Sequence, residues 1–76
     1  MIMSGSKDAV IEHVQLVDIH GTRLYDLVYR HDDTPGALLR ARLGPEALYG
    51  TPNTGDRVRV SYLMGIATGM VRRDST

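Results

Sequence analysis

Arginine and tyrosine side chains at alternate positions of short segments are the residues best suited to chemistry in this sequence. Guanidinium groups donate paired hydrogen bonds to phosphate or carboxylate, and tyrosine rings stack on nucleic-acid bases. Eight of the nine cations are arginine, which favours bidentate contacts of this kind. The candidate nucleic-acid-binding residues are Arg23, Tyr25, Tyr29, Arg40, Arg42, Arg57 and Arg59.

The same side chains also have ordinary structural explanations. The chain has no Phe or Trp, so tyrosine is the only large aromatic residue that can fill a core or a dimer interface. Arginines on a strand face are equally consistent with solvation, or with cross-strand ion pairs to Glu12 and Asp26. Both explanations stay open for each residue of the candidate face.

One cluster of imidazole and carboxylate groups has the chemistry of a metal or acid–base site. It comprises His20, His31, Asp32 and Asp33, with Asp18 nearby in the sequence. These residues fall in expected turns, where such side chains serve solvation and local backbone hydrogen bonds. No regular ligand spacing accompanies them. We therefore expect no metal site and no cofactor.

Signatures of catalysis are lacking in the sequence. Ser61 has no nucleophile elbow around it, and no glycine-rich run matches a phosphate-binding loop or a dinucleotide fingerprint. A domain of this size is also too small to enclose a substrate pocket of the usual volume. We expect that the protein is not an enzyme.

Length and charge restrict the protein class further. The 76 residues allow one small domain with a thin core, and there is no cysteine to form a stabilising disulfide. Homodimerisation is one way in which such a domain could bury more apolar surface. Residues 1–36 have a net charge of −3 and residues 37–76 a net charge of +3, which is most simply explained by pairing between the two halves. No apolar run is long enough for a membrane span, and no signal peptide is recognisable, so we expect a soluble cytoplasmic protein without membrane contact.

Short strands separated by turn signals are the elements that must position these side chains. Residues 9–19 are rich in β-branched residues and alternate in two phases, which predicts a long strand with a bulge after Leu16. An N-terminal helix ending at Gly21 is the alternative for this segment. The residues His20-Gly21-Thr22 predict a tight turn, because glycine tolerates a positive φ.

Further strands are expected at 23–30, 37–43, 57–64 and 66–73, with one or two helical turns over 44–50. Residues 37–43 also fit a helix by composition, but the glycines on either side leave only a strand-sized segment. In the fourth strand, the residues expected to face the core are Val58, Val60, Tyr62 and Met64. The last strand is expected to be weakened or bulged at Gly69. Residues 1–8 are an expected flexible lead-in, 9–73 the domain and 74–76 a tail.

Two segments near the C-terminus carry a family resemblance. Residues 55–60 (Gly-Asp-Arg-Val-Arg-Val) and 68–73 (Thr-Gly-Met-Val-Arg-Arg) resemble the last two strands of bacterial translation initiation factor one and its single-domain relatives. The resemblance implies a five-stranded OB-type barrel, with RNA binding as the family's activity. Asp26 and the pair Asp32-Asp33 depart from the basic character of that family.

The sequence thus predicts an all-β protein with one short helix, a small five-stranded OB-like β-barrel. We expect a non-enzymatic binding module that takes single-stranded RNA or DNA on its outward Arg/Tyr strand face. The alternative is a protein-interaction or self-associating, dimeric module that has no nucleic-acid role.

Overall fold

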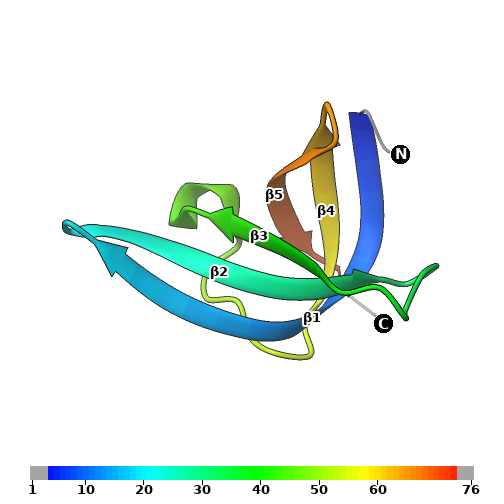
Figure 1. Ribbon diagram of the computed structural model, residues 1–76, viewed down its shortest axis with the longest axis horizontal. Coiled ribbons are helices and arrows are strands. Elements are labelled where there is room, and N and C mark those ends of the chain that lie inside the picture. Colours follow the sequence, from blue (N-terminus) through cyan, green and yellow to red (C-terminus); the bar gives the residue numbers. More distant parts are fainter. Residues whose placement is uncertain (1–3, 74–76) are drawn as a thin grey trace.

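Five antiparallel strands form one sheet in the computed structural model, which describes residues 4–73 (Figure 1). The all-β prediction is confirmed, and a single turn of 3₁₀ helix replaces the one or two helical turns expected over 44–50. The elements are β1 (Ser4–Ile19), β2 (Thr22–His31), β3 (Leu39–Leu43), the 3₁₀ turn η1 (Pro45–Ala47), β4 (Arg57–Leu63) and β5 (Ile66–Arg72).

Two tight turns join consecutive strands. The turn between β1 and β2 contains His20 and Gly21 with φ values of 52° and 82°, and the β4–β5 turn contains Met64 and Gly65 with 52° and 79°. Two consecutive positive φ values are typical of the turns that match the twist of a hairpin. The turn at His20-Gly21 is as predicted. The placement of Met64 in the core is wrong, because the strand ends at Leu63 and Met64 is 71% exposed in the turn.

The first strand is longer than expected and contains a bulge. Residues 4–8 are part of β1 and not a lead-in, since residues 4–10 pair with β4. The helix alternative for 9–19 is wrong, because this segment pairs with β2. The bulge lies at Glu12, between Ile11 and His13, and not after Leu16. It falls just beyond the residues that pair with β4, where the strand bends in Figure 1 and continues beside β2 alone.

The sheet does not close into a barrel. Its strand order is β3-β2-β1-β4-β5, so β3 and β5 are its two edges. Strand β3 has only five residues, because Ala37 and Leu38 of the predicted strand 37–43 lie outside it. No backbone hydrogen bond joins β3 to β5 in the described chain. A closed barrel is therefore not confirmed. Figure 1 shows the β4–β5 hairpin rising at a steep angle to β2 and β3.

The core lies on the concave face of the bent sheet. It consists of Ala9, Ile11, Leu27, Tyr29, Leu43, Val58, Val60 and Met70. The turn η1 contacts β2 and β5 at one end of this core. Gly69 allows a close approach at that contact, because a Cβ there would lie 3.0 Å from the carbonyl oxygen of Ala47. The expected bulge in the last strand is present one residue earlier, at Thr68, where the β4–β5 register shifts.

Candidate functional site

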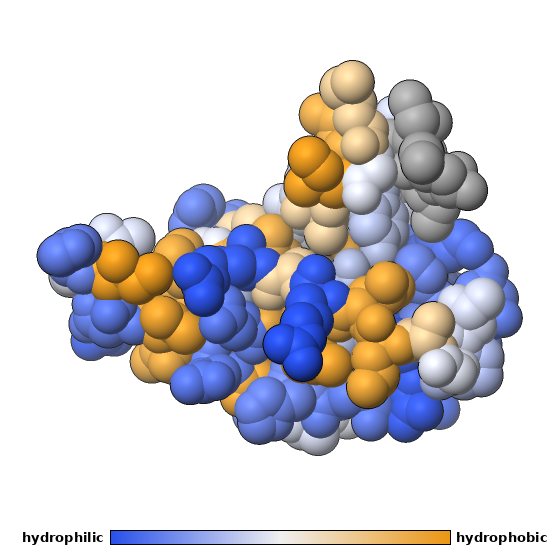
Figure 2. All heavy atoms as spheres, viewed as in Figure 1, coloured by the Kyte–Doolittle hydropathy of each residue, from blue (hydrophilic) through white to orange (hydrophobic). Residues whose placement is uncertain are grey.

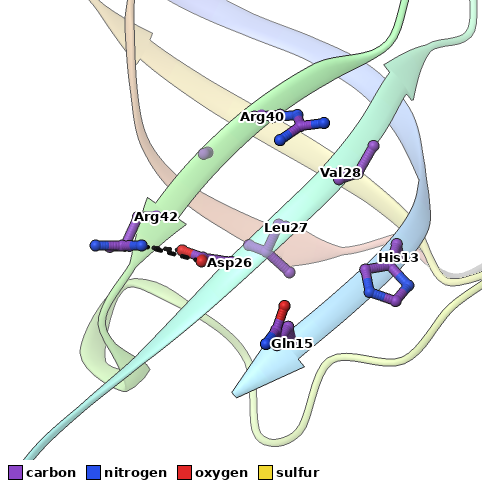
Figure 3. A pocket seen from close by; sticks show the side chains of 8 residues that line it. His13, Gln15, Asp26, Leu27, Val28, Arg40 and Arg42 are labelled. Carbon is purple, nitrogen blue, oxygen red and sulfur yellow. Dashed lines mark hydrogen bonds and ion pairs between the residues drawn. The ribbon is translucent and has the colours of Figure 1, made fainter. Parts of the chain in front are cut away.

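Two rows of side chains cross the outer face of β1, β2 and β3. Alternation along β3 places Leu39, Ala41 and Leu43 towards the core and the arginines between them towards solvent, as predicted. Antiparallel pairing then aligns each arginine with one residue of β2 and one of β1. Written from β3 to β1, the rows are Arg40–Val28–His13 and Arg42–Asp26–Gln15. They line an open hollow of about 440 Å³ (Figure 3).

The two arginines of this hollow differ in their electrostatic state. Arg42 donates to Asp26 through Nε at 2.6 Å from Oδ1 and through Nη2 at 3.1 Å from Oδ2. This bidentate contact lowers the pKa of Asp26 and raises that of Arg42, so each cancels the other's charge. Arg40 forms no ion pair with any residue of 4–73, and Figure 3 shows its side chain extending from β3 towards β2. Among the described residues, Arg40 is therefore the cation of the hollow without an ion-pair partner, although its charge also lowers the pKa of Asp26.

The arginines of β4 lie on a separate surface. Strands β1 and β2 lie between β3 and β4 in the sheet, so Arg57 and Arg59 are not brought beside Arg40. Arg59 donates to Asp8 on β1 at 3.0 Å. Arg57 is exposed opposite Val10 and has no ion pair within the described residues. The predicted basic face is therefore divided into two surfaces, one on β3 and the other on β4.

The tyrosines of β2 point towards the concave face. Tyr29 is 2% exposed and Tyr25 packs against the core, so Tyr29 presents no ring face on which a base could stack. Its hydroxyl lies 2.8 Å from that of Tyr62, which in turn lies 2.7 Å from Nε2 of His31. Burial and the contact with Tyr62 raise the pKa of Tyr29. Arg23 lies at the tip of the β1–β2 hairpin opposite Asp18, apart from the other candidates.

Ion pairs neutralise much of the charge that the sequence separates into two halves. Besides Arg42–Asp26, the pairs among the residues that the structure describes are Arg30–Glu12, Arg59–Asp8, Arg73–Asp8, Arg73–Asp32 and Lys7–Asp33. Four of these six pairs join an acid of residues 1–36 to an arginine of residues 37–76. The expectation that the two halves pair with each other is confirmed by these contacts. Counting only partners among residues 4–73, five of the nine cations pair with a carboxylate.

A second hollow, which the sequence did not reveal, lies between the two edges of the sheet. We call it the seam. It has a volume of about 420 Å³. Its lining residues are Leu39, Arg40, Ala41 and Arg42 of β3, Gly65 of the β4–β5 turn, Ile66 and Ala67 of β5, and Tyr29 and Tyr62. The linked hydroxyls of Tyr29 and Tyr62 thus border it. The sequence signal nearest to it is the apolar residues on either side of Gly65, which the sequence placed at the ends of the strands predicted at 57–64 and 66–73.

The turn cluster of His20, His31, Asp32 and Asp33 does not assemble. His31 is buried against Tyr62, whereas Asp32 and Asp33 pair with Arg73 and Lys7. Within residues 4–73, no group of three or more potential metal ligands comes together. In the same range, no helix has the length and apolar character needed to cross a bilayer. No family model, curated protein or solved structure matches this chain.

Proposed function

We propose that this protein is a protein-interaction module whose seam binds an extended segment of a partner protein. The supporting observation is that the seam is bounded by two strand edges, those of β3 and β5, which are not hydrogen-bonded to each other. An edge strand presents unpaired backbone N–H and C=O groups, and an extended peptide satisfies them by adding a strand. The peptide would extend the sheet from one edge towards the other.

The side chains around the seam suit an apolar occupant. Ala41 and Ala67 are small, and they leave the space that a peptide side chain would fill. Ile66, which lines the seam, is 68% exposed. Met64 and Leu38, the chain neighbours of the lining residues Gly65 and Leu39, are 71% and 64% exposed. Figure 2 shows hydrophobic side chains gathered at the β4–β5 turn. Exposed apolar groups that gather at a hollow mark interaction surfaces.

The fold that we propose is a partly open OB-type barrel. The support is the strand order, in which joining β3 to β5 would close five strands into a ring, together with η1 between β3 and β4. In this description the seam is the unclosed boundary of the barrel. A bound strand would take the place of the missing β3–β5 pairing.

Single-stranded nucleic acid is the second candidate ligand, and one observation favours it. Arg40 has no ion-pair partner among residues 4–73, and it lines both the outer hollow and the seam. Against it, the chain is neutral, and five of its nine cations pair with carboxylates within the described part of the chain. Domains dedicated to nucleic acid are usually basic. Tyr29, one of the two rings expected to stack on bases, is in the core. We therefore favour a protein ligand over single-stranded nucleic acid.

A displayed library of random 12-residue peptides tests the proposal. The wild-type protein should enrich a family of peptides, and Ala67→Trp should not, because the indole fills the seam. Gln15→Trp is the matched control, since it adds the same side chain to the outer hollow and should enrich like the wild type. Circular dichroism would establish that both variants fold.

Three outcomes would count against the proposal. One is no enrichment by the wild-type protein, and another is equal enrichment by Ala67→Trp. The third is a concentration-dependent dimer that Ala67→Trp dissolves, which would assign the seam to a second copy of this chain. Labelled poly-pyrimidine RNA and DNA, measured by anisotropy at two salt concentrations, would show whether nucleic acid binds instead.

A further inference from the structure

We infer that the segment taken by the seam is acidic, with carboxylate side chains alternating with apolar ones. The inference rests on the proposed function and adds the chemistry of the ligand. The starting observation is that two arginines line the seam and no carboxylate does. A hollow lined by charge of one sign selects an occupant of the opposite sign.

Arg40 supplies the charge that remains available. It is exposed in the middle of β3, and it has no carboxylate partner among residues 4–73. Its cross-strand neighbour on β2 is Val28, which offers no hydrogen bond to the guanidinium. The other arginine, Arg42, already shares its charge with Asp26. A ligand carboxylate would therefore pair with Arg40 without breaking an existing ion pair.

The alternation follows from the geometry of β3. Side chains of a strand added to β3 would lie beside those of β3 on the same two faces of the sheet. On the concave face they would meet Leu39, Ala41 and the ring of Tyr62, which are apolar or aromatic. On the outer face they would meet Arg40 and, two residues on, Arg42. Apolar residues are therefore expected at alternate positions, with Asp or Glu between them.

The same display selection tests this alternation of acidic and apolar residues directly. Peptides enriched by the wild-type protein should carry Val, Ile, Leu or aromatic residues at every second position, and Asp or Glu at an intervening one. Selection on Arg40→Glu should keep the apolar alternation and replace the acid by Lys or Arg. Arg57→Glu is the matched control, because Arg57 is exposed and unpaired within residues 4–73 but lies on β4, away from the seam. It should leave the acidic preference unchanged.

A binding measurement with one enriched peptide completes the test. Replacing its central acid by Lys should weaken binding to the wild type about fivefold, the effect of about one exposed ion pair. The same replacement should strengthen binding to Arg40→Glu. Apolar alternation without an acidic preference would overturn this inference and leave the proposed function standing. Absence of any enriched peptide would overturn both, and an acidic preference unchanged in Arg40→Glu would overturn the role of Arg40.

Discussion

Removal of the Tyr62 hydroxyl should destabilise the protein far more than removal of the Tyr25 hydroxyl. The Tyr62 oxygen is 2.8 Å from the Tyr29 hydroxyl and 2.7 Å from Nε2 of His31. Both partners are nearly buried, at 2% and 8% exposed, so Tyr62→Phe leaves two polar groups with little access to water. The hydroxyl of Tyr25 has no hydrogen-bond partner in the described chain, and Tyr25→Phe is thus the matched control.

The magnitude follows from the cost of an unsatisfied buried polar group, about 1–3 kcal/mol each. Two such groups, partly relieved by water entering the seam beside Tyr62, suggest a loss of about 2–4 kcal/mol in the free energy of unfolding. A chain of this length is expected to have only about 4–11 kcal/mol in total. The loss would therefore be readily measurable.

Urea unfolding followed by circular dichroism at 25 °C measures the difference. Tyr62→Phe should unfold at a clearly lower urea concentration with an unchanged slope, and Tyr25→Phe should remain within about 0.5 kcal/mol of the wild type. Equal stability of Tyr62→Phe and the wild type would refute the reasoning. So would an equal loss in Tyr25→Phe, since the hydroxyl network would then not be the cause.

Three further predictions concern packing, ionisation and local stability. Gly69→Val should lower the free energy of unfolding by about 1–3 kcal/mol, because the new side chain meets the Ala47 carbonyl. Urea unfolding measures this loss, and the control Gly36→Val should keep the stability of the wild type, because an added Cβ there meets no other atom. The pKa values of Tyr29 and Tyr49 are raised above 10.0 by burial, so the folded state retains protons that the unfolded chain releases. Stability should therefore fall as the pH rises above 10, and constant stability from pH 9 to 11 would contradict this. Amides of residues 17–24 should exchange with solvent faster than those of 25–29, because β3 pairs only with the latter, and NMR exchange rates would show it.

Local alternation predicted which residues share a face within the strands, but it failed at Met64, which lies beyond the end of its strand. It placed Arg40 and Arg42 on one side of their strand and Val58 and Val60 on the buried side of theirs. It also grouped Tyr25 and Tyr29 correctly, but both faces of β2 are partly apolar, so the pattern did not identify the buried one. That choice depends on packing against β4 and β5, which are distant in the sequence.

For a related reason, the sequence alone did not show that the sheet stays open or that a seam lies between its edges. Whether β3 and β5 pair depends on where the strands bend and end, and alternation alone predicted neither the bulge at Glu12 nor the five-residue length of β3. The ion pairs show the same limit. The charge split indicated that the two halves attract each other, yet only the register between strands shows that Arg42 is compensated and Arg40 is not.

Amide hydrogen exchange with and without an enriched peptide tests the central claim most directly. Strand addition at the seam forms new backbone hydrogen bonds, so amides of β3 or β5 that point away from their paired neighbour should become protected. Protection confined to residues 39–43 or 66–69, and lost in Ala67→Trp, is the predicted result. Protection on the outer hollow around Gln15, or none at either edge of the sheet, would contradict the account.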